Sequence, residues 1–162
     1  MGIDKNKRYT ATIDTSMGQM IVALDPLKAP KTVNSFVFLA RYRYYEGIIF
    51  HRVIQGFVLQ GGDPTGTGSG GPGYRFDDEL PRKGEYELGS LAMANSGPNT
   101  NGSQFFVISG PSGMSLPPSY SLFGKVVKGL DVVEAIQNVP TARGDRPVVD
   151  VVINSITITE AD

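Results

Sequence analysis

The 162-residue sequence is poor in the side chains that hold metal ions or form covalent bonds with substrates. It contains no cysteine and a single histidine, His51, and it also lacks tryptophan. Without cysteine there is no disulfide bond, no thiolate nucleophile and no zinc site with sulfur ligands, and one histidine leaves little for a site built on imidazoles. We therefore expect no metal centre.

A strong charge of either sign and a long apolar run are missing as well. The 15 basic and 16 acidic residues give a net charge of -1, so the chain lacks the basic excess typical of nucleic-acid or anionic-membrane binding. No stretch approaches the ~20 apolar residues of a membrane span, and residues 1–8 have no apolar run typical of a signal peptide. We expect no nucleic-acid partner, no membrane association and a cytoplasmic location.

Glycine and proline, in contrast, are abundant, with 20 and 11 residues, which favours turn-rich β structure over a helical bundle. Residues 9–14 and 156–159 alternate between apolar and polar side chains, as half-buried strands do. Only residues 30–42 and 129–138 carry apolar side chains at helical spacing. Residues 1–162 fit a single domain. We expect an antiparallel barrel or sandwich, with two helices lying against it or capping it.

The stretch from Phe50 to Asp63 places a cation and an amide beside an apolar run. Arg52 and Gln60 bracket the segment Phe57-Val58-Leu59. A continuous apolar run of this kind is typical of a strand packed on both faces, or of a wall between a core and a groove. Because an unpaired charge is costly to bury, Arg52 either has a partner or borders a pocket.

No arrangement for covalent catalysis is visible. His51 stands alone beside an apolar strand, where a hydrogen-bonded structural histidine is the commoner case. Strand alternation would point Asp77 and Asp78 to opposite faces, which disfavours a glycosidase-like pair. The acidic run 77–79 also lacks the spaced ligands of a calcium loop, so we interpret it as a solvated strand edge. The sequence favours binding, or a reaction in which no covalent bond is made or broken.

Three blocks of the sequence carry a resemblance to a known family. They read FHRVIxGFxxQGGD over residues 50–63, MANxGPNTNGSQFF over 93–106 and LFGKV over 122–126. In this order, they resemble the cyclophilin family of peptidyl-prolyl cis-trans isomerases over nearly the whole chain. The resemblance implies a mainly β fold, a closed antiparallel β-barrel of about eight strands with a helix over each end. It also implies a monomeric enzyme that uses no cofactor or metal and acts on proline-containing peptides and unfolded protein chains.

The resemblance also assigns roles to individual residues. Arg52 would donate a hydrogen bond to the prolyl nitrogen of the twisted X-Pro bond, an interaction that is weak in the planar ground state. The positions that match the family's catalytic residues are Arg52, Phe57, Gln60 and Asn95. Those that match its substrate-binding residues are Val58, Gly66, Ala94, Ser96, Thr100, Asn101, Gln104, Phe106, Leu116 and Tyr120.

Apart from Arg52 and Tyr120, these residues divide into three groups by what they would contact. The pocket for the proline ring would consist of Phe57, Val58, Phe106 and Leu116. The groups that fix the peptide backbone or Arg52 itself would be Gln60, Asn95 and Gln104. The groove for the residues before proline would be lined by Gly66, Ala94, Ser96, Thr100 and Asn101.

Three positions depart from the family pattern. Ser115 stands where many members have a tryptophan, and Tyr120 stands where they have a histidine near the pocket rim. Tyr120 still offers a ring and a hydroxyl, so we expect proline binding to persist, with reduced affinity for cyclosporin-like cyclic peptides. Val58 is shorter than the methionine frequent at its position, which would enlarge or loosen the pocket.

Two other functions stay open at this point. A non-catalytic proline-peptide binding module or chaperone would need the same pocket but not Arg52. A small-ligand β-barrel is the third hypothesis, and the amides and hydroxyls of residues 95–104 argue against it. Taken singly, Phe57, Phe106 and Leu116 are more often core residues, and an arginine is more often a surface ion-pair partner. Their joint presence in these blocks favours an isomerase.

Overall fold

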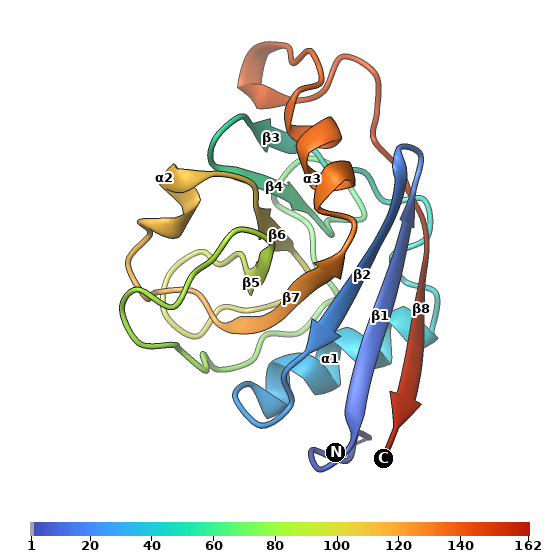
Figure 1. The fold of residues 1–162 in the computed structure, drawn as a ribbon, viewed down its shortest axis with the longest axis vertical. Coiled ribbons are helices and arrows are strands. Elements are labelled where there is room, and N and C mark those ends of the chain that lie inside the picture. Colours follow the sequence, from blue (N-terminus) through green and yellow to red (C-terminus); the bar gives the residue numbers. More distant parts are fainter. Residues whose placement is uncertain (1) are drawn as a thin grey trace.

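The computed structural model describes residues 2–162, which form eight β-strands and three α-helices (Figure 1). The strands are β1 (Arg8–Thr15), β2 (Gly18–Leu24), β3 (Arg52–Ile54), β4 (Val58–Gly61), β5 (Ser90–Met93), β6 (Phe105–Ile108), β7 (Leu122–Lys128) and β8 (Ile153–Ala161). The helices are α1 (Pro30–Arg41), α2 (Pro111–Met114) and α3 (Leu130–Gln137), and a short 3₁₀ helix, η1, covers Arg143–Asp145. None of the helices in this part of the chain is long and apolar enough to cross a membrane.

All eight strands belong to one antiparallel sheet with the order β3-β4-β6-β5-β7-β2-β1-β8. Among the described residues, the edge strands β3 and β8 share no ladder. The segments just before them meet at an isolated bridge between Ile49 and Val152, where the Phe50 amide donates to the Val151 carbonyl at 2.9 Å. The predicted mainly β architecture of about eight antiparallel strands is confirmed. Closure into a barrel stays a prediction.

Two of the helices lie where the sequence pattern predicted them. Helix α1 begins at Pro30, whose fixed φ suits the first turn, and it buries Val33, Phe36 and Val37. Helix α3 lies within the predicted segment 129–138. Figure 1 places α1 near the bottom and α3 near the top of the view. Helix α2 was not predicted, because a four-residue helix is too short to show a helical period.

The first and last strands are neighbours. Strand β1 pairs with β8 along its length, from Arg8 opposite Ala161 onward. The two ends of the chain therefore lie side by side (Figure 1). On β1, Tyr9, Ala11 and Ile13 are buried, which confirms the alternation predicted for residues 9–14.

Strands β4 and β6 are buried on both faces. One face carries Leu59 and Val107 into the main core, which also receives the buried side of α1. The other face carries Val58 and Phe106 into a second, smaller apolar cluster. Successive residues of a strand point to opposite faces, so neighbours in sequence serve different clusters. Val58 and Leu59 thus confirm the expectation of a strand packed on both faces, whereas Phe57 is partly buried and lies in the turn before β4.

Candidate active site

The smaller apolar cluster forms one half of the candidate site. Its buried members are Val58, Tyr86, Ala92, Phe106, Ile108 and Leu122, and the partly buried residues packed against them are Phe57, Ala94, Leu116 and Tyr120. The strand register explains part of this set, because Phe106 lies directly opposite Ala92 and opposed residues point to the same face. The structure thus brings together all four residues predicted to hold a proline ring.

Arg52 continues the same cross-strand row. It lies directly opposite Gln60 in the β3–β4 ladder, and Gln60 lies opposite Phe106 in the β4–β6 ladder. The Arg52 side chain is exposed, and its Nη1 lies 3.5 Å from the Gln60 Oε1. Arg52 takes part in none of the ion pairs found among residues 2–162. Its guanidinium therefore keeps donors available for a ligand.

A line of hydrogen bonds runs from Arg52 to the glycine-rich loop of residues 64–73. Beyond Arg52, the Gln60 Nε2 donates to the Gln104 Oε1 at 3.1 Å. Gln104 in turn donates through Nε2 to the carbonyls of Gly68 and Gly70 at 2.9 and 3.0 Å. Each side-chain amide accepts at one end and donates at the other. The two glutamines therefore restrict the orientation of the guanidinium.

Asp63 holds the glycine-rich loop from inside. Its buried carboxylate accepts hydrogen bonds from the amides of Thr65, Thr67 and Gly68 at 2.8, 3.1 and 2.7 Å, and from the Thr65 hydroxyl at 2.8 Å. Burial alone would raise the pKa of Asp63, but the hydrogen bonds outweigh it and hold the pKa well below its usual range. The carboxylate therefore stays charged and fixes the loop that Gln104 contacts.

A polar groove of about 860 Å³ adjoins the apolar cluster, and Ala94 belongs to both. The glycine-rich loop lines it with residues 68–73, followed by Tyr74 and Arg75. Six of the predicted site residues also line it, namely Gln60, Ala94, Asn95, Ser96, Thr100 and Gln104. A polar groove that runs into an apolar pocket suits an extended peptide that carries one apolar ring.

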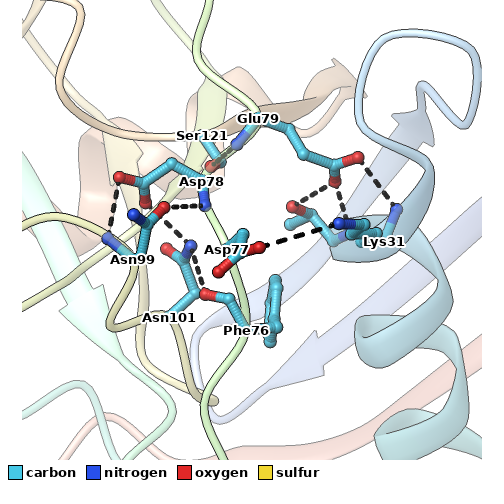
Figure 2. Close-up of polar contacts among 9 residues, drawn as sticks. Lys31, Phe76, Asp77, Asp78, Glu79, Asn99, Asn101 and Ser121 are labelled. Atoms are coloured by element: carbon cyan, nitrogen blue, oxygen red, sulfur yellow. Dashed lines mark hydrogen bonds and ion pairs between the residues drawn. The ribbon is translucent and has the colours of Figure 1, made fainter.

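Two of the five residues predicted to line the groove before proline lie outside its lining. Gly66 has a φ of 68° and lies beside the Ile49 side chain. A β-carbon added at this position would be 3.5 Å from that side chain. The Asn101 side chain is fully buried, and its Nδ2 donates to the Phe76 carbonyl at 3.1 Å and to Asp78 Oδ1 at 2.8 Å (Figure 2). Asn101 therefore holds its own loop in place and does not line the groove, although it was predicted to do so.

Asp78 fixes the same loop through three hydrogen bonds (Figure 2). Besides accepting from Asn101, its carboxylate accepts from the Asn99 amide at 3.0 Å, and its own amide donates to the Asn99 Oδ1 at 3.0 Å. Asn99 has a left-handed φ of 59°, which asparagine tolerates better than most residues. The position of Thr100 in the groove thus depends on Asp78, which lies in a different loop.

The neighbouring Glu79 caps helix α1 (Figure 2). Its carboxylate accepts from the amide and hydroxyl of Thr32 at 2.8 and 2.9 Å, and from the Lys31 amide at 3.2 Å. The N-cap residue, Ala29, offers no capping side chain, and a carboxylate is favourable at the positive end of the helix dipole. The interpretation of this acidic run as a solvated strand edge was wrong, because only Asp77 is exposed.

His51 is 8% exposed, and its Nδ1 has no hydrogen-bond partner among residues 2–162. The hydrogen bond expected of a structural histidine is therefore not found at this atom. Burial lowers the pKa of His51, the Asp63 carboxylate opposes this in part, and the positive charge of Arg52 adds to it. The imidazole is therefore mainly neutral at neutral pH.

Sequence reasoning missed three residues that support the site. Asp78 and Glu79 were noticed for their charge, but their partners lie more than 20 positions away along the chain. Tyr86 was not considered at all, although it is a buried member of the apolar cluster. The only local signal for Tyr86 is a lone aromatic residue within the polar segment 81–89.

The arrangement as a whole suits non-covalent work on a peptide. In the described part of the chain, no group of three or more histidine, aspartate and glutamate side chains could hold a metal ion. The site offers an exposed guanidinium, an apolar pocket and a polar groove. Fold and site together define an antiparallel β protein with a polar groove that adjoins an apolar pocket.

Comparison with known proteins gives the family. The family model described as cyclophilin type peptidyl-prolyl cis-trans isomerase/CLD matches residues 10–158. Peptidyl-prolyl cis-trans isomerase A of Mycobacterium tuberculosis is 46% identical over 168 residues, which cover 93% of this chain and 92% of that protein. The chain belongs to the cyclophilin family, as its sequence blocks predicted.

Two further similarities concern a longer relative and a solved fold. Peptidyl-prolyl cis-trans isomerase-like 2 of Cryptococcus neoformans is 47% identical over 96% of this chain, but the chain spans only 28% of the length of that protein. A crystal structure of a cyclophilin type peptidyl-prolyl cis-trans isomerase of Cryptosporidium parvum shares 37% identity with a TM-score of 0.88, over 94% of this chain and 98% of that one. The same protein was also solved in the presence of the dipeptide Ala-Pro, with a TM-score of 0.87.

Proposed function

We propose that this chain accelerates rotation about X-Pro bonds in peptides and folding proteins by stabilising the twisted amide, with no covalent intermediate. The observation that carries the proposal is the position of Arg52. It is an exposed cation outside the ion pairs of residues 2–162, in one cross-strand row with Gln60 and Phe106. A module that only bound proline peptides would need the apolar pocket but no cation beside it.

The reaction requires stabilisation of one nitrogen atom. Resonance gives the X-Pro bond a rotation barrier of ~18–20 kcal/mol and makes the unaided reaction slow. In the planar state the prolyl nitrogen is a poor hydrogen-bond acceptor, whereas twisting the bond returns its lone pair. Arg52 would donate to this nitrogen only in the twisted state, and such an interaction lowers the barrier without tightening ground-state binding.

One hydrogen bond does not account for the whole acceleration. A rate increase of about five decades would need about 7 kcal/mol, whereas a hydrogen bond to a charged group contributes about 1.5–3 kcal/mol. The rest would come from removing water and from holding the two sides of the bond at different angles. The pocket of Phe57, Val58, Phe106 and Leu116 would hold the ring, while Gln60, Asn95 and Gln104 would fix the backbone or Arg52.

The substrate proposed is an extended peptide with a proline residue. The relative solved in the presence of Ala-Pro supports this choice, since it shares 37% identity and nearly the whole fold. Ala94, Ser96 and Thr100 would contact the residues before proline. Gly66 and Asn101 would act indirectly, by shaping the loops that border the groove.

Two finer proposals concern the sheet and a class of inhibitor. We propose that the sheet closes into a barrel, which the bridge between Ile49 and Val152 supports. We also propose weak binding of cyclosporin-like cyclic peptides. Ser115, at the position of the family's tryptophan, is exposed at the end of α2, and its hydroxyl donates to the Pro111 carbonyl at 3.2 Å. Because serine has no ring, such a ligand would lose the contact that the tryptophan provides.

A protease-coupled assay on a tetrapeptide with an Ala-Pro bond tests the proposed function. We expect kcat/KM to fall about 10- to 150-fold in Arg52→Ala, the loss of one hydrogen bond from a charged donor. Arg41→Ala, which removes a surface cation paired with Glu160, is the matched control and should behave like the wild type. Equal rates for the wild type and Arg52→Ala would contradict the role of Arg52. Peptide binding without wild-type activity would favour the binding module.

A further inference from the structure

Tyr86 lies under the rim of the proposed proline pocket, in the loop before β5. It is 2% exposed and packs in the same apolar cluster as Phe106. Its hydroxyl donates to the Tyr120 carbonyl at 2.6 Å and accepts from the Tyr120 amide at 3.2 Å. One phenol therefore satisfies both backbone polar groups of a single residue.

Tyr120 is the residue that the pair of hydrogen bonds holds in place. Its ring is half-buried and meets Phe106 edge to face, with the ring centroids 5.3 Å apart and the planes at 84°. Among the described residues, no backbone-to-backbone hydrogen bond holds Tyr120. Fixing the amide and carbonyl of a residue fixes the direction of its Cα–Cβ bond, so the Tyr86 hydroxyl sets where the Tyr120 side chain leaves the backbone, and the contact with Phe106 orients its ring.

The residues on either side of Tyr120 are anchored by other segments. Asn95 donates through Nδ2 to the Ser119 carbonyl at 2.9 Å. The Ser121 hydroxyl accepts from the Glu79 amide at 2.8 Å (Figure 2). Three successive residues thus have three separate anchors, and the one at Tyr120 is the buried phenol of Tyr86.

We propose that Tyr86 is a positioning residue that acts through Tyr120 to set the rim of the proline pocket, and so the affinity for X-Pro peptides. The inference rests on the proposed function of the site. The prolyl ring keeps its shape when the X-Pro bond rotates, so its contact with Tyr120 is similar in the planar and twisted states. Such uniform binding affects KM and the dissociation constant, but not kcat. Burial raises the pKa of Tyr86 to about 12, so the phenol remains a donor throughout the usual assay range.

The variant Tyr86→Phe removes the hydroxyl and keeps the buried ring. We expect KM and the dissociation constant of an Ala-Pro tetrapeptide to rise about 3- to 10-fold, with kcat within about two-fold of the wild type, as for the loss of ordinary hydrogen bonds. The matched control is Tyr9→Phe, which removes another hydroxyl from a tyrosine that is 2% exposed and accepts a hydrogen bond from the Asp4 amide. Exchange NMR spectroscopy gives kcat and KM, and titration gives the dissociation constant.

A double-variant cycle tests whether the effect passes through Tyr120. In a Tyr120→Ala background, removing the Tyr86 hydroxyl should change KM and the dissociation constant no further. Equal KM values for Tyr86→Phe and Tyr9→Phe, or independent effects of Tyr86 and Tyr120, would overturn the inference while leaving the proposed function intact. If the wild type bound the peptide without isomerising it, the proposed function would fail, and the dissociation constants would still test the role of Tyr86.

Discussion

The guanidinium of Arg52 and the side-chain oxygen of Gln60 lie 3.5 Å apart at directly opposed positions of the β3–β4 ladder. This contact is longer than the 3.1 Å between Gln60 and Gln104 in the same line of hydrogen bonds. A weak contact restrains the guanidinium without using up its donors. Gln60 therefore guides Arg52 and leaves it able to bind an acceptor on the substrate.

The first prediction concerns this guidance. Replacing Gln60→Ala should lower kcat/KM about 3- to 10-fold, less than Arg52→Ala, since the guanidinium would remain but lose one orienting contact. The double variant Arg52→Ala/Gln60→Ala should be little worse than Arg52→Ala alone, because the two residues act as a unit. The protease-coupled assay on all three variants measures this. Fully additive losses would indicate that Gln60 works independently of Arg52.

The second prediction concerns the loop that Asp78 fixes. In Asp78→Asn, one carboxylate oxygen becomes an amide donor that faces either the Asn99 amide or the Asn101 Nδ2. We expect faster hydrogen exchange at residues 99–101 and a KM about 3- to 10-fold higher, because one hydrogen bond is lost and two donors meet.

The adjacent residue provides the control for this experiment. Asp77→Asn makes the same charge change one position away, where the side chain is exposed and lies 3.9 Å from Lys31 in a surface ion pair. Such pairs contribute little, so exchange and KM should stay at wild-type values. If Asp77→Asn and Asp78→Asn gave the same KM, charge and not loop geometry would be the cause.

The third prediction concerns stability. Glu79→Ala should lower the free energy of unfolding by about 1–2 kcal/mol, as expected for the loss of a helix cap. The cost arises because Thr32 is fully buried, and its amide and hydroxyl both donate to the Glu79 carboxylate. Glu79→Gln keeps one acceptor oxygen and should lose less. Urea denaturation of the two variants measures the difference, and an unchanged midpoint for Glu79→Ala would contradict the capping role.

The fourth prediction concerns acid. The pKa of Asp63 lies well below its usual range in the folded state, whereas in the unfolded chain it returns to about 3.9. Above about pH 5 both states are ionised, so this contribution to stability is fully present. As the pH falls below about 4, only the unfolded state takes up the proton, and the free energy of unfolding decreases.

The comparison that isolates this contribution uses Asp63→Asn. The variant should be less stable than the wild type at pH 7, because an amide cannot accept all the hydrogen bonds from Thr65, Thr67 and Gly68. The difference between the two proteins should shrink as the pH falls from 5 to 2. Thermal unfolding across this range measures it, and a difference independent of pH would exclude Asp63 as the titrating group.

The sequence predicted the parts of this protein whose causes are local. The strand at residues 9–14 and the helix at Pro30 follow from alternation, helical spacing and a proline with a suitable φ. Phe57 and Phe106 were found because long motif blocks fixed them together, and the strand register places Phe106 and Val58 on the same face of the sheet, in one cluster. In each case the signal lay within one segment or one block.

The parts that could not be predicted depend on contacts between distant segments. Asn95 and Asn101 look alike in sequence, yet Asn95 lines the groove and Asn101 is buried because Asp78 accepts its side-chain hydrogen bond. Glu79 accepts hydrogen bonds from the start of a helix 47 positions earlier in the chain, and Tyr86 donates one to a backbone carbonyl 34 positions later. No periodicity or spacing within a segment carries such information.

The pairing of β1 with β8 also determines how the fold would respond to a mechanical load. Arg8 and Ala161 are opposed at the open end of this antiparallel ladder, next to both chain ends. A force that separates the ends would act perpendicular to the strands and break the hydrogen-bonded pairs one after another from this end. It would not load many hydrogen bonds of the ladder at the same time. The chain should therefore yield at low force when pulled from its two ends.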